Sequence, residues 1–411
     1  VRVELRSGYT RTEIGVVPTA WSVTPLARSA AIAHGFGFQS RYFGRVRGYR
    51  LMTPGHFHEA GGFKDVGEKQ KFYDGPVSDR YVLGKGDLIV AMTEQADGLL
   101  GSAALVPVGG VYLHNQRLGK VTTLSKDLSL GFLYRVFNSP TYRVKVRETA
   151  AGTKVKHTSP SKLLAIPVAI PPTKAEQEAI AVVLSDADAL IESLEQLLAK
   201  KRHLKQGAMQ ELLTGKKRLP GHNRPWLAKR LGDLGSFSKG SGVSKGESKS
   251  GPLPCVRYGE IYTRHDAFIR EFHSRISSGV AATATRLQRG DILFAGSGET
   301  KEEIGKCVAF VDQFEAYAGG DIVVLRTVDA DPYFLGYYLN TAEINRQKAS
   351  RGQGDAVVHI GAAALAQIRG WFPPPEEQAA IAEVFLDIDT EIDTLEAKLT
   401  KARQIKQGMM Q

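Results

Sequence analysis

Residues 172–210 read PTKAEQEAIAVVLSDADALIESLEQLLAKKRHLKQGAMQ, and residues 373–411 read PPPEEQAAIAEVFLDIDTEIDTLEAKLTKARQIKQGMMQ. The two stretches align without a gap at a constant offset of 201 residues, and 20 of the 39 aligned positions are identical. A duplication of this length at half-chain spacing predicts two similar halves related by a pseudo-twofold axis.

Both stretches are expected to be long helices. Thr173 can cap the first helix, with Glu176 completing a capping box, and prolines 373–375 stand at the start of the second. Apolar residues then recur every three or four positions, which is typical of a coiled-coil seam. This seam runs through Ile180, Leu184, Ala187, Ile191, Leu194 and Leu198, and through Ile381, Phe385, Ile388, Ile392, Leu395, Leu399 and Ala402. We therefore expect an antiparallel helix pair, about 60 Å long at about 1.5 Å per residue.

The segments around the helices also repeat, although more faintly. Their shared anchors are a Trp-to-Leu segment (Trp21–Leu26 and Trp226–Leu231), a Gly-Asp strand start (Gly86-Asp87 and Gly290-Asp291) and a glycine turn (Gly152 to His157 and Gly354 to His359). Between the anchors the two sequences differ. Each lobe is expected to be α+β, with helical patches near residues 132–137 and 334–339. We divide the chain into a permuted tail (1–20), a first lobe (21–170), a first helical region (171–218), a second lobe (219–371) and a second helical region (372–411).

Composition favours a polyanionic partner and excludes some classes. The 411 residues carry a net charge of +11 and a pI near 9.4, as expected for a nucleic-acid-binding protein. Two cysteines argue against a disulfide scaffold and suit a reducing compartment. No apolar run approaches the length of about 20 residues that spans a bilayer.

No catalytic constellation is visible in the sequence. The Pro-Pro pairs lack the flanking residues of an adenine-methyltransferase loop, and Gly298 to Cys307 has the wrong spacing for a phosphate loop. His56 and His58 lack further metal ligands, so a surface loop is the expectation there. We expect Cys255 and Cys307 to be buried small apolar residues. The Asp186-Asp188 and Asp387-Asp389 pairs are expected on solvated faces or at partner contacts.

The duplicated order resembles one family. The chain has a lobe, then a helix that opens with Pro171-Pro172 and Glu176-Gln177, then a second lobe and a helix that opens with Pro373-Pro374 and Glu377-Gln378. This order resembles the DNA-specificity subunit of Type I restriction–modification enzymes. The resemblance covers essentially the whole chain. It implies two target-recognition domains that read the halves of a bipartite asymmetric site, separated by a helical ruler.

Further expectations follow from the resemblance. It implies a non-catalytic cytoplasmic subunit that docks two methyltransferase subunits and restriction (motor–nuclease) subunits on double-stranded DNA. No cofactor is expected on this chain; S-adenosylmethionine would be bound by the methyltransferases, and ATP and Mg by the restriction subunits. For helix pairing and partner binding we single out Glu176, Gln177, Ile180, Leu184, Ile191, Leu194, Leu198, Glu377, Gln378, Ile381, Phe385, Ile392, Leu395 and Leu399.

Candidate DNA contacts are basic residues next to aromatic or glycine-rich stretches, because arginine reads guanine edges and glycine lets backbone approach phosphates. They are Arg41, Arg45, Arg47, Arg50 and Lys154 in the first half, and Lys239, Lys245, Lys249, Arg257, Arg264, Ser297, Thr300, Lys301 and Arg351 in the second. Charged strand edges or flexible surface loops are the alternative for these stretches. For the whole chain, the alternatives are a related bipartite-site system that cuts on both sides of its site, a self-contained restriction–methylation enzyme fragment, and a coiled-coil scaffold that never touches DNA.

Overall fold

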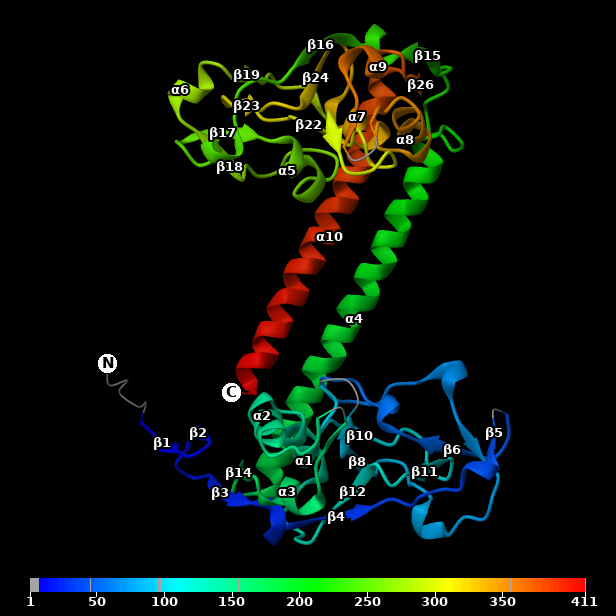
Figure 1. Ribbon diagram of the computed structural model, residues 1–411, viewed down its shortest axis with the longest axis vertical. Coiled ribbons are helices and arrows are strands. Elements are labelled where there is room, and N and C mark those ends of the chain that lie inside the picture. Colours follow the sequence, from blue (N-terminus) through cyan, green and yellow to red (C-terminus); the bar gives the residue numbers. More distant parts are fainter. Residues whose placement is uncertain (1–6, 45, 95–97, 154, 355–356, 411) are drawn as a thin grey trace. The chain divides into compact units, whose positions relative to one another are not determined.

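The computed structural model describes residues 7–44, 46–94, 98–153, 155–354 and 357–410 (Figure 1). The chain forms two compact units, one made of Val1–Glu192 with Lys401–Gln411 and the other of Ser193–Thr400. Each unit therefore combines a lobe with parts of both long helices. Among the described residues, no helix is long and apolar enough to cross a membrane.

The two predicted helices are α4 (Lys174–Leu212) and α10 (Pro375–Met409). Within the second unit they run antiparallel, because Lys201 pairs with Glu391 and Lys205 with Asp389 further back along α10. The seam is buried at Leu184 and Leu198 of α4 and at Phe385, Ile392 and Leu399 of α10. This confirms the long helices and their antiparallel pairing.

The start of α4 differs from the predicted capping box. The Thr173 hydroxyl accepts the backbone N–H of Glu176 at 3.2 Å, as expected. The Glu176 carboxylate, however, accepts the indole N–H of Trp21 at 3.0 Å. Only half of the box forms, because a tertiary contact takes the acidic side chain.

Each lobe is built on a four-stranded antiparallel sheet of the same design. In the first unit the order is β10 (Ala103–Leu105), β8 (Leu88–Ala91), β12 (Leu118–Thr123) and β4 (Ala30–His34). In the second it is β22 (Cys307–Ala309), β20 (Asp291–Ala295), β24 (Ile322–Thr327) and β16 (Gly235–Lys239). The Gly-Asp anchors therefore lie at the start of the same central strand, β8 or β20.

Helices cover one face of each sheet. They are α1 (Leu130–Phe137), α2 (Pro140–Glu148) and α3 (Pro160–Ala165) in the first unit, and α7 (Pro332–Tyr338), α8 (Ala342–Ala349) and α9 (Ala362–Ala366) in the second. Leu88 and Val90 of β8 pack in the core with helix residues such as Leu133, whereas Ile89 and Ala91 pack in a separate core on the opposite face. Both faces are therefore buried, and the predicted helical patches are confirmed as α1 and α7.

A smaller sheet packs on the other face. In the first unit its order is β11 (Tyr112–His114), β6 (Tyr49–Met52), β7 (Phe72–Tyr73) and β5 (Phe43–Gly44). In the second it is β18 (Ser274–Ile276), β17 (Leu253–Val256), β23 (Tyr317–Ala318) and β19 (Thr285–Arg286). Both contain one parallel pair, β6–β11 and β17–β23. The outer strands differ, which places the variable part of each lobe in this smaller sheet.

Short paired strands complete the repeat. The Trp-to-Leu anchors become β3 (Ser22–Pro25) paired with β14 (Pro167–Ile170), and β15 (Leu227–Arg230) paired with β26 (Arg369–Phe372). The glycine-turn anchors become β13 (Lys156–His157) paired with β9 (Thr93–Glu94), and β25 (Val358–His359) paired with β21 (Ser297–Gly298). The other elements are β1 (Tyr9–Thr12), β2 (Gly15–Pro18), α5 (Tyr258–Thr263) and α6 (Ser278–Ala281).

Candidate nucleic-acid interface

In the first lobe, basic and aromatic side chains share the outer part of the smaller sheet. Arg41 lies over the ring of Tyr42 at 4.9 Å, and Arg50 lies over Tyr112 at 5.8 Å. Phe43 and Tyr49 are exposed large hydrophobic residues between these arginines. Arg47 is exposed as well, whereas the predicted Arg45 lies outside the described residues. Stacked guanidinium groups and exposed rings together suit a nucleic-acid surface.

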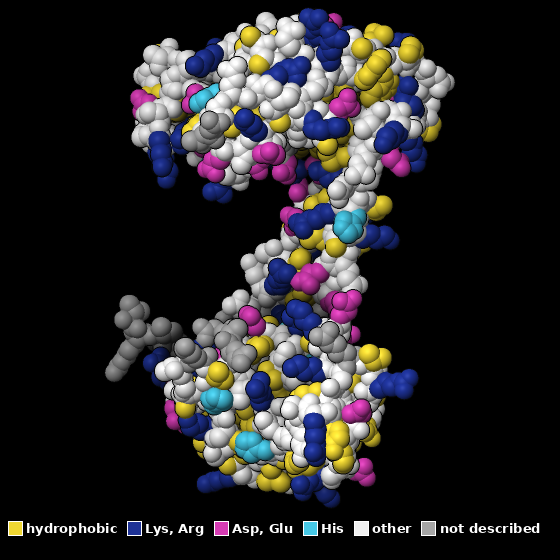
Figure 2. All heavy atoms as spheres, turned by 45° about the vertical axis from the view of Figure 1, so that its right-hand side comes forward, with side chains coloured by type: hydrophobic (Ala, Val, Ile, Leu, Met, Phe, Trp, Pro, Cys, Tyr) yellow, Lys and Arg dark blue, Asp and Glu magenta, His cyan; other side chains and the backbone are white. Residues whose placement is uncertain are grey.

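In the second lobe, the predicted basic residues fall into two separate places. Lys239, Lys245 and Lys249 are exposed on β16 and on the connection to β17, and Arg257 caps α5. Arg264 follows α5 and lines a groove together with Ser297. Figure 2 shows lysine and arginine side chains scattered over the visible surface of the lobes, with no single basic patch.

The short strands that follow the glycine turns, β13 and β25, pair with β9 and β21. In the second lobe, the β21–β25 pairing brings the Ser297 hydroxyl to 2.9 Å from Nδ1 of His359. Thr300 and Lys301 are exposed on the adjoining loop, while Arg351 donates to the carbonyl of Gln347 at 2.9 Å. Ser297 itself is buried, so its hydroxyl serves the pairing. Lys154, at the matching turn of the first lobe, lies outside the described residues.

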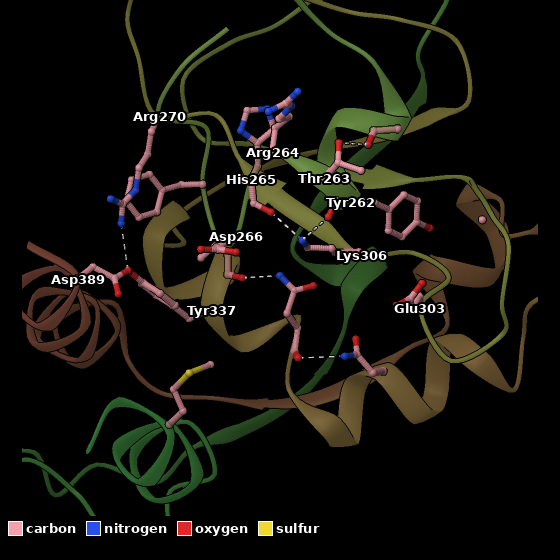
Figure 3. Close-up of a pocket in the computed structure, with 18 of the residues that line it drawn as sticks. Tyr262, Thr263, Arg264, His265, Asp266, Arg270, Glu303, Lys306, Tyr337 and Asp389 are labelled. Atoms are coloured by element: carbon pink, nitrogen blue, oxygen red, sulfur yellow. Dashed lines mark hydrogen bonds and ion pairs between the residues drawn. The ribbon is translucent and has the colours of Figure 1, made fainter. Parts of the chain in front are cut away.

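A groove of about 1280 Å³ opens in the second unit between α5, the loop 299–306 and the long helices (Figure 3). Its lysines and arginines are mostly engaged: Lys306 donates to the carbonyls of His265 at 2.7 Å and Tyr262 at 3.3 Å. Within the described residues, no ion pair is seen for the groove acids Asp266, Glu299, Glu302 and Glu303. Free carboxylates repel phosphates but can accept a hydrogen bond from the amino group of cytosine. This loop therefore suits contact with base edges better than contact with the DNA backbone.

Two buried histidines have strongly lowered pKa values. Burial lowers the pKa of His265, which lines the groove, to about 4, with His273 and Lys306 contributing. Burial likewise lowers the pKa of His114 in the first lobe to about 4. His56 is also buried, and it bonds to Gln70 at 2.9 Å. The expectation of a surface loop was therefore wrong for His56, because its ring fills the first lobe's core, although His58 is exposed.

The described residues contain no group of three or more histidines, cysteines or acids that could hold a metal ion. Cys255 and Cys307 are free and buried, as predicted. Burial raises the pKa of the Cys307 thiol to about 11. Neither thiol is therefore poised for nucleophilic chemistry.

The repeated Glu-Gln pairs join each long helix to its lobe. Glu377 is fully buried and accepts Arg218 at 2.5 and 2.6 Å and the Trp226 indole at 3.2 Å. Gln177 accepts the backbone N–H of Ser129 at 2.8 Å, and Gln378 that of Asp331 at 3.0 Å. The sequence reasoning had grouped these pairs with the helix seam, whereas the structure places their side chains against the lobes.

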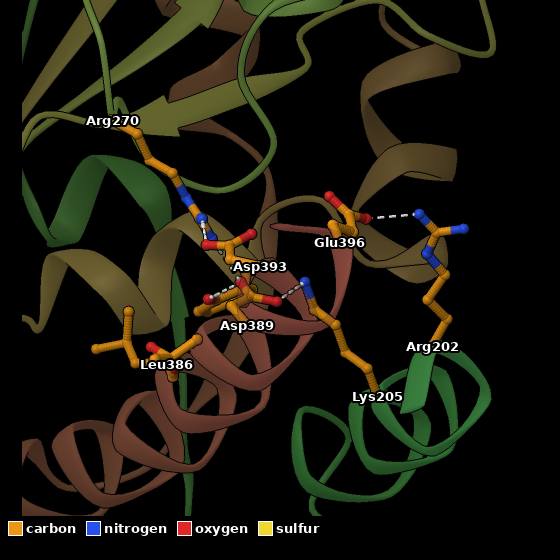
Figure 4. A network of polar contacts seen from close by, with 9 residues as sticks. Arg202, Lys205, Arg270, Leu386, Asp389, Asp393 and Glu396 are labelled. Atoms are coloured by element: carbon orange, nitrogen blue, oxygen red, sulfur yellow. Dashed lines mark hydrogen bonds and ion pairs between the residues drawn. The ribbon is translucent and has the colours of Figure 1, made fainter. Parts of the chain in front are cut away.

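A second joint centres on aspartates that the sequence reasoning left on solvated faces or at unnamed contacts. Asp389 of α10 receives Lys205 at 2.5 Å, Arg270 at 3.3 Å and the Tyr337 hydroxyl at 2.7 Å (Figure 4). In the first unit, Asp188 of α4 receives Lys406 at 2.5 Å and also Arg135 of α1. The sequence signal for this joint was that its Asp and Lys, and the Gln and Gly that follow the Lys, recur at the same offset in both halves.

Comparisons with known proteins agree with this architecture. The family model described as "Type I restriction modification DNA specificity domain" matches residues 67–200 and 223–404. The chain is similar to the S subunit of a Type-I restriction-modification system from M. genitalium, with a TM-score of 0.60 and 15% identity over 99% of this chain and 97% of that one.

Two further solved structures are similar to this chain. One is a chain from a structure of the type I R-M system, described as the "structural basis underlying complex assembly and conformational transition" of that system. It matches with a TM-score of 0.52 and 17% identity, covering 96% of this chain and 97% of that one. The HsdS subunit from Thermoanaerobacter tengcongensis matches with a TM-score of 0.47 and 17% identity, covering 96% of both chains. No curated protein matches the chain by sequence. At these identities the first two solved structures bear on the fold alone, and the family model bears on function.

Proposed function

The chain belongs to the family of Type I restriction modification DNA specificity domains, and we propose that each of its units reads one half of a bipartite, asymmetric DNA site. It is a DNA-recognition subunit and is not itself catalytic. The two matched segments fall one on each lobe and its helix, so recognition is present twice.

One observation carries the proposal: the frame of the two lobes is the same, but their outer surfaces differ. The central sheets share their strand order, whereas the first lobe presents Arg41, Arg47 and Arg50 and the second presents Lys239 and Lys301. Base edges are read by side chains, while phosphate contacts only position the protein. Different side chains on one frame imply different half-sites, and hence an asymmetric whole.

The helices α4 and α10 are proposed to set the unread gap between the half-sites. A helix does not stretch, so the distance between its ends is fixed by residue number. We expect half-sites about one DNA turn apart, since two lobes on the same face of DNA must keep the helical phase.

We propose that α4 and α10 also dock methyltransferase subunits. Four large apolar side chains of α4 are exposed at intervals of seven residues, namely Val183, Leu190, Leu197 and Leu204. Such spacing is typical of a surface that another helix covers. The middle of α10 carries Glu391 and Lys398 at the matching positions, so the two helices offer unequal surfaces.

Methylation and cleavage of the DNA are assigned to partner subunits. Two methyltransferase subunits would bind S-adenosylmethionine, and restriction subunits would use ATP and Mg for translocation and cutting. All of them act on double-stranded DNA, so we infer that the complex works in the cytoplasm.

The decisive experiment is single-molecule methylation mapping of genomic DNA from cells that carry this chain and its methyltransferase, compared with a deletion of this chain alone. We expect one bipartite, asymmetric motif to lose methylation in the deletion. Exchanging residues 21–170 for another recognition domain should change only one half of the motif. An unchanged methylation map would contradict the proposal and favour a scaffold, which a binding titration at two salt concentrations would then test.

A further inference from the structure

A lysine in the second lobe is buried without an acidic partner. Lys348 of α8 has no solvent-exposed surface. Its ammonium donates to the carbonyls of Gly305 at 2.8 Å and Leu339 at 2.9 Å, and among the described residues it forms no ion pair. Burial lowers the pKa of Lys348. Because burying a charge without a counter-ion is costly, a residue of this kind needs a reason beyond packing.

The carbonyl of Gly305 closes the loop that runs from β21 to β22. Gly305 has a φ of +71°, and a Cβ at this position would lie 3.0 Å from Cδ of Lys348. Next to it, Lys306 donates to the carbonyls of Tyr262 and His265. Two ammonium groups therefore hold the end of the loop through backbone atoms, and the exposed Thr300 and Lys301 project from the same loop.

The first lobe holds its matching loop by a different device. There Gly101 corresponds to Gly305, and Val146 of α2 corresponds to Lys348. A Cβ on Gly101 would lie 3.0 Å from the Val146 side chain, as a Cβ on Gly305 would from Lys348. The loop is held by the buried Glu94, whose carboxylate accepts the backbone N–H groups of Gly98, Leu99 and Leu100 at 3.1, 2.8 and 2.7 Å.

The buried groups that hold the loop thus differ between the lobes. In the second lobe the Lys348 ammonium binds a loop carbonyl from α8, whereas in the first the Glu94 carboxylate binds N–H groups and Arg143 of α2 donates to the carbonyl of Gly98. The core strands and covering helices are shared, so a requirement of the common frame does not explain the exchange. The difference follows the loops themselves, which carry different residues in the two lobes.

We propose that Lys348 is a positioning residue for DNA reading: it fixes the path of the loop 299–305 and so sets which bases the second lobe accepts. Glu94 has the same role for the first lobe. The inference rests on the proposed function, since it assumes that these loops face the two half-sites.

The test uses the full chain in complex with its methyltransferase subunits. The variant Lys348→Met keeps the length of the side chain and removes its N–H donors. Binding is measured to the matched site and to sites with single base changes in either half. We expect discrimination in the half read by the second lobe to fall on the order of 10-fold, the value of one specific base contact, with the other half unchanged. For Glu94→Gln we expect the same loss of discrimination in the half read by the first lobe, with the other half unchanged.

The matched control is Lys229→Met, which removes an exposed lysine from β15 of the same lobe and should leave discrimination in both halves unchanged. Uniformly weaker binding by Lys348→Met with discrimination intact would make Lys348 a stability residue and overturn the proposal. If Lys348→Met does not fold, the double variant Thr300→Ala/Lys301→Ala decides, since unchanged discrimination would then overturn it. Wild-type protein without bipartite discrimination would instead refute the proposed function.

Discussion

The ammonium of Lys205 on α4 lies 2.5 Å from the carboxylate of Asp389 on α10, and Lys406 and Asp188 repeat this pair at the same spacing in the first unit. The two aspartates differ in their surroundings. Asp389 is nearly buried and also receives Arg270 and Tyr337, whereas the side chain of Asp188 is 38% exposed. One repeated contact therefore has two different strengths.

Replacement of Asp389 by alanine should destabilise the second unit by about 2–4 kcal/mol, because it leaves Lys205 and the buried Tyr337 hydroxyl without this acceptor, while Arg270 keeps its pair with Asp393. The matched change Asp188→Ala should cost less, about 1 kcal/mol in the first unit, because solvent reaches Asp188 and screens its pairs with Lys406 and Arg135. Urea unfolding combined with limited proteolysis of each unit measures both. Equal losses would contradict the distinction.

Glu377 and Glu176 provide a second comparison across the repeat. Glu377→Gln removes the negative charge and one of the two oxygens that accept from Arg218 and Trp226, so we expect a loss of about 2–3 kcal/mol. Glu176→Gln affects one indole hydrogen bond, and a loss under about 1 kcal/mol is expected. Thermal melts followed by tryptophan fluorescence report both joints, and a larger effect at Glu176 would refute the assignment.

Acid should weaken the fold through His114 and His265. Burial lowers their pKa values to about 4 in the folded chain, against an ordinary value of 6.5 for histidine. Between these values the unfolded chain binds more protons, so stability falls as the pH falls through the window from about 6.5 to 4. At pH 5 each histidine should cost on the order of 1–2 kcal/mol.

Unfolding free energies measured at pH 7 and pH 5 test this sign. His114→Gln and His265→Gln should each flatten the pH dependence. A pH dependence that persists in both buried variants would show that other groups dominate.

Gly207 interrupts an exposed stretch of α4, and a Cβ there would meet nothing within 4 Å. Gly207→Ala should therefore stabilise the isolated chain by about 1 kcal/mol, because alanine is the better helix former. If a partner helix approaches closely at this position, the same change should weaken methyltransferase binding. Gly354→Ala is the contrasting variant: with a φ of +111° and a Cβ 2.1 Å from the Val357 carbonyl, it should destabilise.

Arg47 is proposed to contact phosphate or base in the first half-site. If it contacts phosphate, Arg47→Gln should lower affinity equally for all sequences and reduce the slope of log K against log salt by about 1. If it reads a base, discrimination in that half should fall instead. Arg224→Gln is the control, because Arg224 is exposed and paired with Glu376 at 3.0 Å. If Arg47→Gln behaves like this control, Arg47 does not contact the DNA.

The sequence predicted those features that rest on periodicity and repetition. The heptad seam and the prolines located α4 and α10, and the repeated Phe-rich patches located α1 and α7. The contacts of Glu176 could not be predicted, because a capping box and a distant tryptophan compete for one carboxylate and only the folded lobe decides between them. Lys348 was equally invisible, since a lysine in a short polar helix normally faces solvent.

The membership of residues 401–411 in the first unit has a consequence for folding during synthesis. The first lobe leaves the ribosome early, yet the lysine that pairs with Asp188 is made after the whole second unit. Until Lys406 arrives, Asp188 keeps its pair with Arg135 of α1 but lacks the pair that joins α4 to α10 in the first unit. The two long helices of the first unit can therefore join only after some two hundred further residues have been added, and a partner that binds α4 meanwhile would raise the yield of assembled protein.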